Sequence, residues 1–174
     1  HCTECNIEVD ANNTITIQDN GRGVPFGKAA DGSETLENIF TKLHTGAKFD
    51  SDGKTGYNTS GGMNGVGAKA TNALSEYFLV QSSRDRKNAI ATFEKGKLVH
   101  YEENKWADDT PHYETYTMVS FKPDATIFKE GIVLEYEPLY KQLKELAYLS
   151  PGLTFKLDYF GKECQIITSQ NGIK

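Results

Sequence analysis

Apolar and polar residues alternate with a period of two along much of this chain, and that pattern predicts β-strands. Residues 5–9 and 14–19 alternate in this way around an Asn-Asn turn, so together they predict a β-hairpin. Ile15 and Ile17 are expected on the buried face of the hairpin, and Asp19 continues the same parity. Burying a carboxylate at a strand end costs free energy unless a partner satisfies it, so Asp19 is the first candidate functional residue.

The rest of the chain contains both helical and strand patterns. They predict helices over residues 34–43, 66–76 and 139–147, and strands at 77–83, 88–94, 97–102, 114–121 and 153–159, with a last strand ending near 168. Ser33 is the expected N-cap of the first helix. The expected inward face of the second helix consists of Val66, Ala70, Ala73 and Leu74. Because the helices are inserted irregularly among clustered strands, the expected class is an α+β sandwich.

Two glycine-bearing segments carry the candidate chemistry. Residues 19–23 read Asp-Asn-Gly-Arg-Gly and place one carboxylate where an apolar strand turns. Residues 61–67 contain four glycines in seven positions and lead directly into the second predicted helix. Glycine-rich backbone at a helix N-terminus can hold phosphates through its N–H groups, and a carboxylate can accept a hydrogen bond from a base edge. The pair therefore indicates a nucleotide site.

Two commoner glycine-loop motifs fit less well. A P-loop needs Gly-x4-Gly-Lys-Ser/Thr, but Gly67 is followed by Ala68, Lys69 and Ala70, so the lysine is displaced and the magnesium-binding hydroxyl is absent. A dinucleotide fingerprint matches residues 65–70 only loosely, because it requires an apolar strand immediately upstream and the chain is polar there. Each feature taken singly also has an ordinary explanation, since Asp-Asn-Gly often forms a tight turn and lysines are usually solvated.

Length and charge narrow the class of protein. With 174 residues the chain is expected to form a single domain with a real core. Its net charge of −5 argues against DNA binding as the main task of these residues. No apolar run approaches the length of a membrane span and no signal peptide is visible, so we expect no membrane contact and a cytoplasmic location.

The three cysteines, Cys2, Cys5 and Cys164, do not make a disulfide framework. Cys2 and Cys5, beside His1, have the spacing of a metal knuckle, but a zinc site needs four ligands and the chain has no second cysteine pair. Cys5 shares strand parity with Ile7 and Val9, which suits a small buried side chain. We therefore expect a structural role for Cys5 and no metal site.

Taken in order along the chain, these segments resemble one superfamily of ATPases. Residues 17–25 resemble the first glycine box of the gyrase, Hsp, histidine-kinase and mismatch-repair ATPases, and residues 61–67 resemble the second. Residues 43–50, 115–121 and 172–174 are similar to the B subunits of bacterial type II DNA topoisomerases, gyrase and topoisomerase IV. The resemblance implies a Bergerat-type ATPase fold, which is a two-layer sandwich of a mixed, mostly antiparallel sheet with helices on one face.

The resemblance also implies a role for each candidate residue toward ATP. Asp19 would accept a hydrogen bond from the adenine amino group, and Thr117 on a neighbouring strand would complete recognition of the base through a shared water. Val24 and Pro25 would form an apolar wall, and the polar stretch 44–64 would close over the triphosphate as a lid. The full implied ATP-binding set is Asp19, Arg22, Gly23, Val24, Pro25, Lys48, Gly61, Gly62, Asn64, Gly65, Val66, Gly67 and Thr117.

The catalytic groups of the resembled family are expected outside these residues. In that family a helix that would lie upstream of His1 carries a glutamate general base and an asparagine that binds Mg²⁺, and a transducer domain would follow Lys174. Residues 1–174 are therefore expected to form one ATP-binding subdomain without catalytic or metal-binding residues, inactive as an ATPase by itself. For the whole protein the resemblance implies ATP with Mg²⁺, ATP-dependent self-dimerisation, a topoisomerase A-type partner subunit, and DNA bound through other domains.

Two alternatives stay open at this point. A mismatch-repair or histidine-kinase ATPase would share Asp19 and the glycines but not the run at 44–50, and a non-catalytic adaptor would have the fold with a degenerate site. The chain also departs from the family at two positions. Ile90 stands where gyrase B usually has an arginine at the pocket mouth, and Asn58 stands where many relatives have a lysine.

Overall fold

The computed structural model describes residues 2–42, 66–105, 114–129, 132 and 134–169. The strands are β1 (Glu4–Val9), β2 (Ile15–Asp19), β3 (Ser75–Arg84), β4 (Lys87–Glu94), β5 (Lys97–Lys105), β6 (Tyr116–Pro123), β7 (Thr154–Tyr159) and β8 (Gln165–Thr168). The helices are α1 (Thr35–Thr41), α2 (Val66–Ala73) and α3 (Tyr136–Leu149). None of these described helices is long and apolar enough to cross a membrane.

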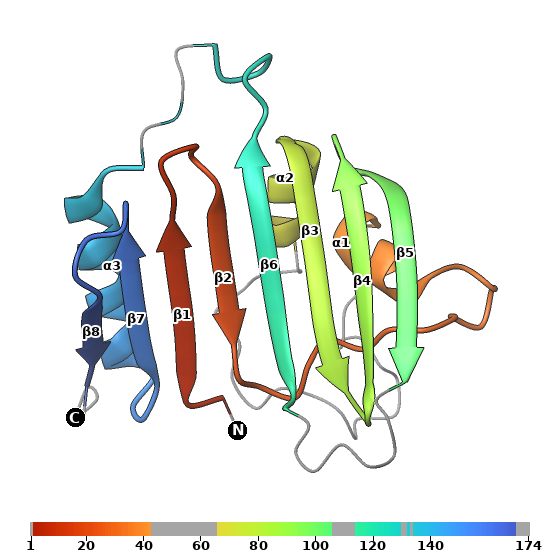
Figure 1. Cartoon of the computed structure of the whole chain (residues 1–174), viewed down its shortest axis with the longest axis horizontal. Helices are drawn as coiled ribbons and strands as arrows, with labels where there is room; N and C mark the ends of the chain where they lie inside the picture. Colours follow the sequence, from red (N-terminus) through yellow and green to blue (C-terminus); the bar gives the residue numbers. More distant parts are fainter. Residues whose placement is uncertain (1, 43–65, 106–113, 130–131, 133, 170–174) are drawn as a thin grey trace.

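A single eight-stranded sheet contains all of these strands, in the order β5-β4-β3-β6-β2-β1-β7-β8. Neighbouring strands are antiparallel except for β1 and β7, which are parallel. Figure 1 shows the three described helices on the same side of the sheet, with α3 behind β7 and β8 and the other two behind β3 to β6. The expectation of an α+β sandwich with a mixed sheet and helices on one face is confirmed.

The strand pattern in the sequence located each of these strands. The largest difference is at the end of β5, which was expected at residue 102 and extends to Lys105. The predicted hairpin is present, since β1 and β2 pair antiparallel and the N–H of Asp10 donates to the carbonyl of Thr14 at 3.0 Å. Asn13 adopts a left-handed φ of 59° in that turn, a conformation that asparagine tolerates better than most residues.

The helices bury two apolar clusters against the sheet. The cluster under α3 contains Ile7, Val9, Ile15, Leu143, Ala147, Phe155, Leu157, Tyr159 and Ile167. The cluster under α1 contains Leu36, Phe40, Phe78, Val80, Ala89, Ala91 and Phe93. Phe121 on β6 packs against both clusters, so the core is continuous across the middle of the sheet.

The expected N-cap of the first helix was wrong. The cap residue of α1 is Glu34, in an extended conformation and without a side-chain capping bond. Ser33 lies one residue earlier, where its N–H donates to Asp31 Oδ1 at 3.0 Å and its hydroxyl accepts from Asn38 Nδ2 at 2.7 Å. The bond to Asp31 therefore holds Ser33 outside the helix. The Ser33 hydroxyl bonds to side chains instead of to the first N–H groups of α1.

The expected inward face of the second helix was also wrong. Val66, Ala70, Ala73 and Leu74 are all exposed, and the buried residues of α2 are Lys69 and Asn72. Asn72 Nδ2 donates to the carbonyl of Phe40 at 3.0 Å, so α2 contacts α1 through a polar side chain. Because that bond satisfies a buried carbonyl at the end of α1, the polar side of this short helix faces inward.

Ile17 differs from expectation as well. Its partner on the same face, Ile15, is buried, but Ile17 is 38% exposed. In Figure 1 no described helix lies behind this part of β2, because on the helix-covered face α3 lies behind β7 and β8 and the other two helices lie behind β3 to β6. Parity correctly predicts the face of the sheet that Ile17 occupies, but it cannot predict which helices cover that face.

Replacing Phe78 by Ala is expected to lower the free energy of unfolding by about 3–5 kcal/mol. The side chain is 1% exposed, and its ring centroid lies 5.6, 6.0 and 6.2 Å from those of Phe40, Phe93 and Phe121. Urea unfolding followed by circular dichroism measures the loss. Tyr148→Ala, at a position 52% exposed, is the control and should change stability by less than about 0.5 kcal/mol. Equal losses in both variants would contradict this assignment of the core.

Candidate functional site

A row of polar side chains crosses the helix-facing side of the sheet near one end. Cross-strand pairing places Cys5, Asp19, Thr117 and Ser82 opposite one another on β1, β2, β6 and β3. Directly opposite residues of a sheet share a face, so these four side chains lie on one line. The next row along the same face is apolar, with Ile7, Ile17, Val119 and Val80. The polar row is therefore a localised feature at the end of an otherwise apolar surface.

Asp19 is the charged member of this row. It is half-buried, and its Oδ1 accepts a hydrogen bond from the N–H of Gly21 at 2.8 Å. Burial raises the pKa of its carboxyl above the usual value, and the Gly21 bond opposes this only in part. A desolvated carboxylate with remaining acceptor capacity is suited to receive an N–H donor from a ligand.

Asn20, the next residue, fixes the end of β2 against the start of β1. Its Oδ1 accepts from the N–H groups of Thr3 at 2.8 Å and Glu4 at 3.0 Å, and its Nδ2 donates to the hydroxyl of Thr3 at 2.9 Å. These bonds hold the backbone directly after Asp19. The sequence interpretation treated Asn20 only as part of a turn and missed this anchoring role, for which the chain itself gives no signal.

The backbone of Val24 is held at both of its polar groups. Its N–H donates to Thr117 Oγ1 at 3.2 Å, and its carbonyl accepts from Ser82 Oγ at 2.8 Å. Gly23 makes this approach possible, because it has a φ of 74° and a Cβ there would lie 2.4 Å from the carbonyl oxygen of Ser83. The loop after Asp19 thus returns to the polar row and packs tightly on β3.

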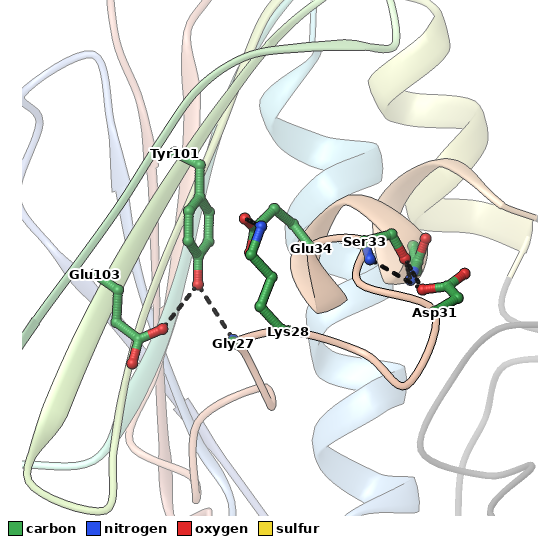
Figure 2. A network of polar contacts seen from close by, with 8 residues as sticks. Gly27, Lys28, Asp31, Ser33, Glu34, Tyr101 and Glu103 are labelled. Carbon is green, nitrogen blue, oxygen red and sulfur yellow. Dashed lines mark hydrogen bonds and ion pairs between the residues drawn. The ribbon is translucent and has the colours of Figure 1, made fainter.

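A second anchor holds the same loop farther along, at β5 (Figure 2). The N–H of Gly27 donates to the hydroxyl of Tyr101 at 3.1 Å, and that hydroxyl donates to Glu103 Oε2 at 3.1 Å. Lys87 donates to the other oxygen of Glu103 at 3.1 Å. Burial and the neighbouring carboxylates raise the pKa of Tyr101 to about 12, so the hydroxyl keeps its proton at neutral pH. Beyond this anchor, Lys28 and Glu34 form an ion pair that closes the loop before α1.

The N-terminus of α2 lies toward the same end of the sheet. In Figure 1 β2 ends and β6 begins at the lower edge, while α2 runs upward to meet the start of β3. Val66 and Gly67 therefore form the end of α2 that faces this edge, and both are exposed. Exposed N–H groups at a helix N-terminus favour anionic ligands. The predicted residues Lys48, Gly61, Gly62, Asn64 and Gly65, and the whole predicted lid at 44–64, lie outside the described residues.

The remaining predicted ATP-binding positions and Ile90 are placed as follows. Arg22 is exposed and Pro25 is half-buried beside Val24. Ile90 pairs with Gln81 and Glu102, whereas its neighbour Ala89 continues the row that contains Asp19. Ile90 therefore lies on the opposite face of the sheet from Asp19, and its expected place at the pocket mouth is not observed.

The expected catalytic groups stay a prediction. The general base and the magnesium ligand were assigned upstream of His1, and His1 itself lies outside the described residues. Asn58, the second departure from the resembled family, also lies outside them. The described part of the site therefore bears on recognition of a ligand and not on the chemistry of hydrolysis.

Sequence reasoning missed Ser82, which is fully buried at the end of the row. One signal was available, because Ser82 continues the buried parity of Phe78 and Val80 along β3 but has a polar side chain. Cys5 packs against the apolar cluster under α3, as its strand parity predicted, and Cys2, Cys5 and Cys164 are free thiols in the structure. Burial raises the pKa of Cys5 to about 12, which leaves an unreactive thiol.

The geometry around Gly23 leads to a stability prediction. Gly23→Ala should lower the free energy of unfolding by more than the roughly 1–3 kcal/mol of left-handed strain alone, because the new Cβ would also meet the Ser83 carbonyl at 2.4 Å. Gly32→Ala is a matched control with a φ of 82° and no heavy atom within 4 Å of the added Cβ. Denaturant unfolding compares the two variants. A loss at Gly23 no larger than the loss at Gly32 would refute the close approach.

The raised pKa of Asp19 leads to a prediction on pH. The folded state holds the Asp19 proton more tightly than the unfolded state does, so this residue lowers stability as the pH rises through and above the ordinary aspartate value of 3.8. Asp19→Asn removes that penalty and should gain stability relative to wild type between acidic and neutral pH. Asp10→Asn should show the opposite trend, because hydrogen bonds from the Thr14 and Asn12 backbone lower the pKa of Asp10. Unfolding free energies measured across pH 3–7 test both signs.

The chain resembles known proteins in both sequence and fold. No family model matches the chain. It is 42% identical to the DNA gyrase B subunit of Synechocystis over 88% of the chain and 14% of that protein. It is 40% identical to the DNA topoisomerase 4 B subunit of Staphylococcus aureus over 93% of the chain and 24% of that protein. The chain therefore spans less than a quarter of the length of these relatives.

The fold has a close counterpart among solved structures. The chain superposes on the 43K ATPase domain of Thermus thermophilus gyrase B, in complex with an aminocoumarin, with a TM-score of 0.78 and 27% identity. That match covers 98% of the chain and 41% of the Thermus domain. Sequence and fold thus agree along almost the whole chain, which is a homologue of the ATPase region of the B subunits of bacterial gyrase and topoisomerase IV.

Proposed function

We propose that this chain binds ATP, with the adenine base held at the polar row. The observation that carries the proposal is the position of Asp19 directly opposite Thr117, at the end of an apolar surface. Asp19 is a desolvated acceptor for the adenine amino group. Thr117 Oγ1 accepts from the N–H of Val24, which leaves its hydroxyl proton free to donate to a ring nitrogen or to a bridging water. Apolar Ile17, 38% exposed beside them, suits the face of the base.

The phosphates are proposed to lie at the start of α2. The orientation of α2 supports this, because Val66 and Gly67 face the end of the sheet that carries Asp19. We place the second glycine box, including Gly61, Gly62, Asn64 and Gly65, around the phosphates. We propose that residues 44–64 act as a lid, with Lys48 contributing positive charge, and that Arg22, Val24 and Pro25 flank the base.

We propose that the longer protein is a type II DNA topoisomerase B subunit. In this proposal ATP binding dimerises two such domains and closes a gate around a DNA duplex, and hydrolysis resets the gate. DNA is bound through other domains, a topoisomerase A-type subunit is the partner, and the assembly works in the cytoplasm. The similarity to gyrase and topoisomerase IV B subunits supports this reading over a mismatch-repair or histidine-kinase ATPase.

Magnesium is the cofactor expected with ATP, and its protein ligand was predicted upstream of His1. No group of three or more His, Cys, Asp or Glu side chains in the described ranges could hold a metal ion. We therefore assign no step to the metal here and propose that its protein ligand and the general base belong to a segment upstream of His1. Residues 1–174 are proposed as one ATP-binding subdomain that binds the nucleotide without hydrolysing it.

Calorimetric titration with a non-hydrolysable ATP analogue tests the proposal. The chain is expected to bind one equivalent saturably, and Asp19→Asn should weaken binding about 10- to 100-fold, because it removes a charged acceptor worth roughly 1.5–3 kcal/mol. Glu8→Gln is a matched control, since Glu8 is an exposed strand carboxylate on the opposite face of the neighbouring strand. Equal affinities of the Asp19→Asn and Glu8→Gln variants for the analogue would contradict the placement of adenine at the polar row. Absence of saturable binding by the wild-type chain would refute ATP binding itself.

A further inference from the structure

Two neighbouring hydroxyls hold both polar groups of one backbone residue in the loop. Ser82 and Thr117 are directly paired across β3 and β6. Ser82 Oγ donates to the carbonyl of Val24 at 2.8 Å, and Thr117 Oγ1 accepts from the N–H of the same residue at 3.2 Å. We call these two hydroxyls and the backbone of Val24 the Val24 clamp. Ser82 is fully buried and Thr117 is 9% exposed, so only Thr117 is in a position to reach a ligand.

The clamp sets the direction in which Thr117 can donate. A threonine hydroxyl has one proton and two acceptor lone pairs. As long as Val24 donates to one lone pair, the proton of the Thr117 hydroxyl is directed away from the Val24 N–H. This orientation depends on the position of Val24, which the Ser82 bond fixes from the other end.

Removing the Ser82 hydroxyl would release that position. The Val24 carbonyl would lose its donor in a partly buried setting, and the loop would shift or rotate to find another donor. Arg84 Nη1 reaches the neighbouring Gly23 carbonyl only at 3.5 Å, the limit of a hydrogen bond, so it is a poor replacement. Movement of Val24 would break its bond to Thr117, and the Thr117 proton would lose its fixed direction.

We infer that Ser82 is a positioning residue for base recognition, acting on the nucleotide through Val24 and Thr117. This inference rests on the proposed binding of ATP and deepens it. It assigns part of the selectivity for adenine to a side chain that does not contact the ligand. The effect should be specific to the edge of the base, because Ser82 lies on the line that contains Asp19 and not at the start of α2.

The adjacent Ser83 provides a matched control. It is also a fully buried serine on β3, and its hydroxyl donates to the carbonyl of Glu114 at 2.6 Å. Consecutive residues of a strand point to opposite faces, so the side chain of Ser83 lies on the other side of the sheet. Ser82→Ala and Ser83→Ala each remove one partly buried hydrogen bond to a backbone carbonyl. Their losses of stability should be similar, and only the first should affect recognition of the base.

The experiment is a pair of titrations of the whole chain with ATP and with ITP, which carries a 6-oxo group in place of the adenine amino group. Ser82→Ala should weaken ATP binding about 3- to 10-fold, the range that corresponds to one hydrogen bond. ITP binding should change less. The dissociation constant for ITP divided by that for ATP should therefore fall in Ser82→Ala. Ser83→Ala should leave both constants and their ratio within about twofold of wild type. A purely structural role for Ser82 would weaken both nucleotides equally.

The outcomes separate the inference from the proposed function. No ATP binding by the wild-type chain refutes the proposed function itself. Wild-type binding with an unchanged ATP-to-ITP ratio in Ser82→Ala refutes the role of Ser82 alone. If Ser82→Ala does not fold, the variants Ser82→Thr and Ser82→Val test the role of Ser82. The threonine and valine side chains have nearly the same shape and differ by the hydroxyl group. The threonine variant should then bind ATP at least about threefold more tightly than the valine variant, and equal affinities overturn the inference.

Discussion

The pairing of β2 with β6 and of β6 with β3 is the constraint on which the candidate site depends. It places Asp19, Thr117 and Ser82 on one line, although they are far apart in the sequence. A shift of one residue in either pair would turn one of these polar side chains to the opposite face of the sheet. The apolar rows beyond this line fix the register, because this pairing buries Phe78 and Ile15 and places Phe121, opposite both of them, against the two apolar clusters. Core packing therefore positions the site.

The loop that follows β2 extends this arrangement across the end of the sheet. It is held at β1 through Asn20, at β6 and β3 through Val24, and at β5 through Gly27. The N–H of Thr35 then donates to the carbonyl of Gly27 at 2.8 Å, which ties the start of α1 to the same loop. One connection thus links the strands on both sides of the site. The hydrogen bonds of this loop therefore link the two halves of the sheet at the end that carries Asp19, in addition to the contacts that Phe121 makes with both apolar clusters.

The sequence predicted the strands and the chemistry of the site better than it predicted the helix layer. Alternation is a local signal, so β1 to β8 could be found from it. Asp19 was identified because it is a charged residue at a position where the alternation predicts the buried face of the strand. The face of α2 depends on a bond from Asn72 to a carbonyl of α1, which no local pattern contains. The exposure of Ile17 depends on the spacing of helices across the sheet. Ser82 gave a weak signal as a buried polar residue, but its partner Val24 lies 58 positions away.

Binding and stability compete at this end of the sheet. Asp19 is partly desolvated and Ile17 is partly exposed, so each is less favourable in the folded chain than a residue chosen for packing alone. The hydrogen bonds around Val24 and Gly27 offset this cost by making the loop rigid before a ligand arrives, and a rigid site loses less entropy on binding. A substitution in the row therefore changes two free energies at once. Asp19→Asn relieves desolvation and removes an acceptor, so a gain in stability together with a loss of affinity is the signature of a residue retained for binding.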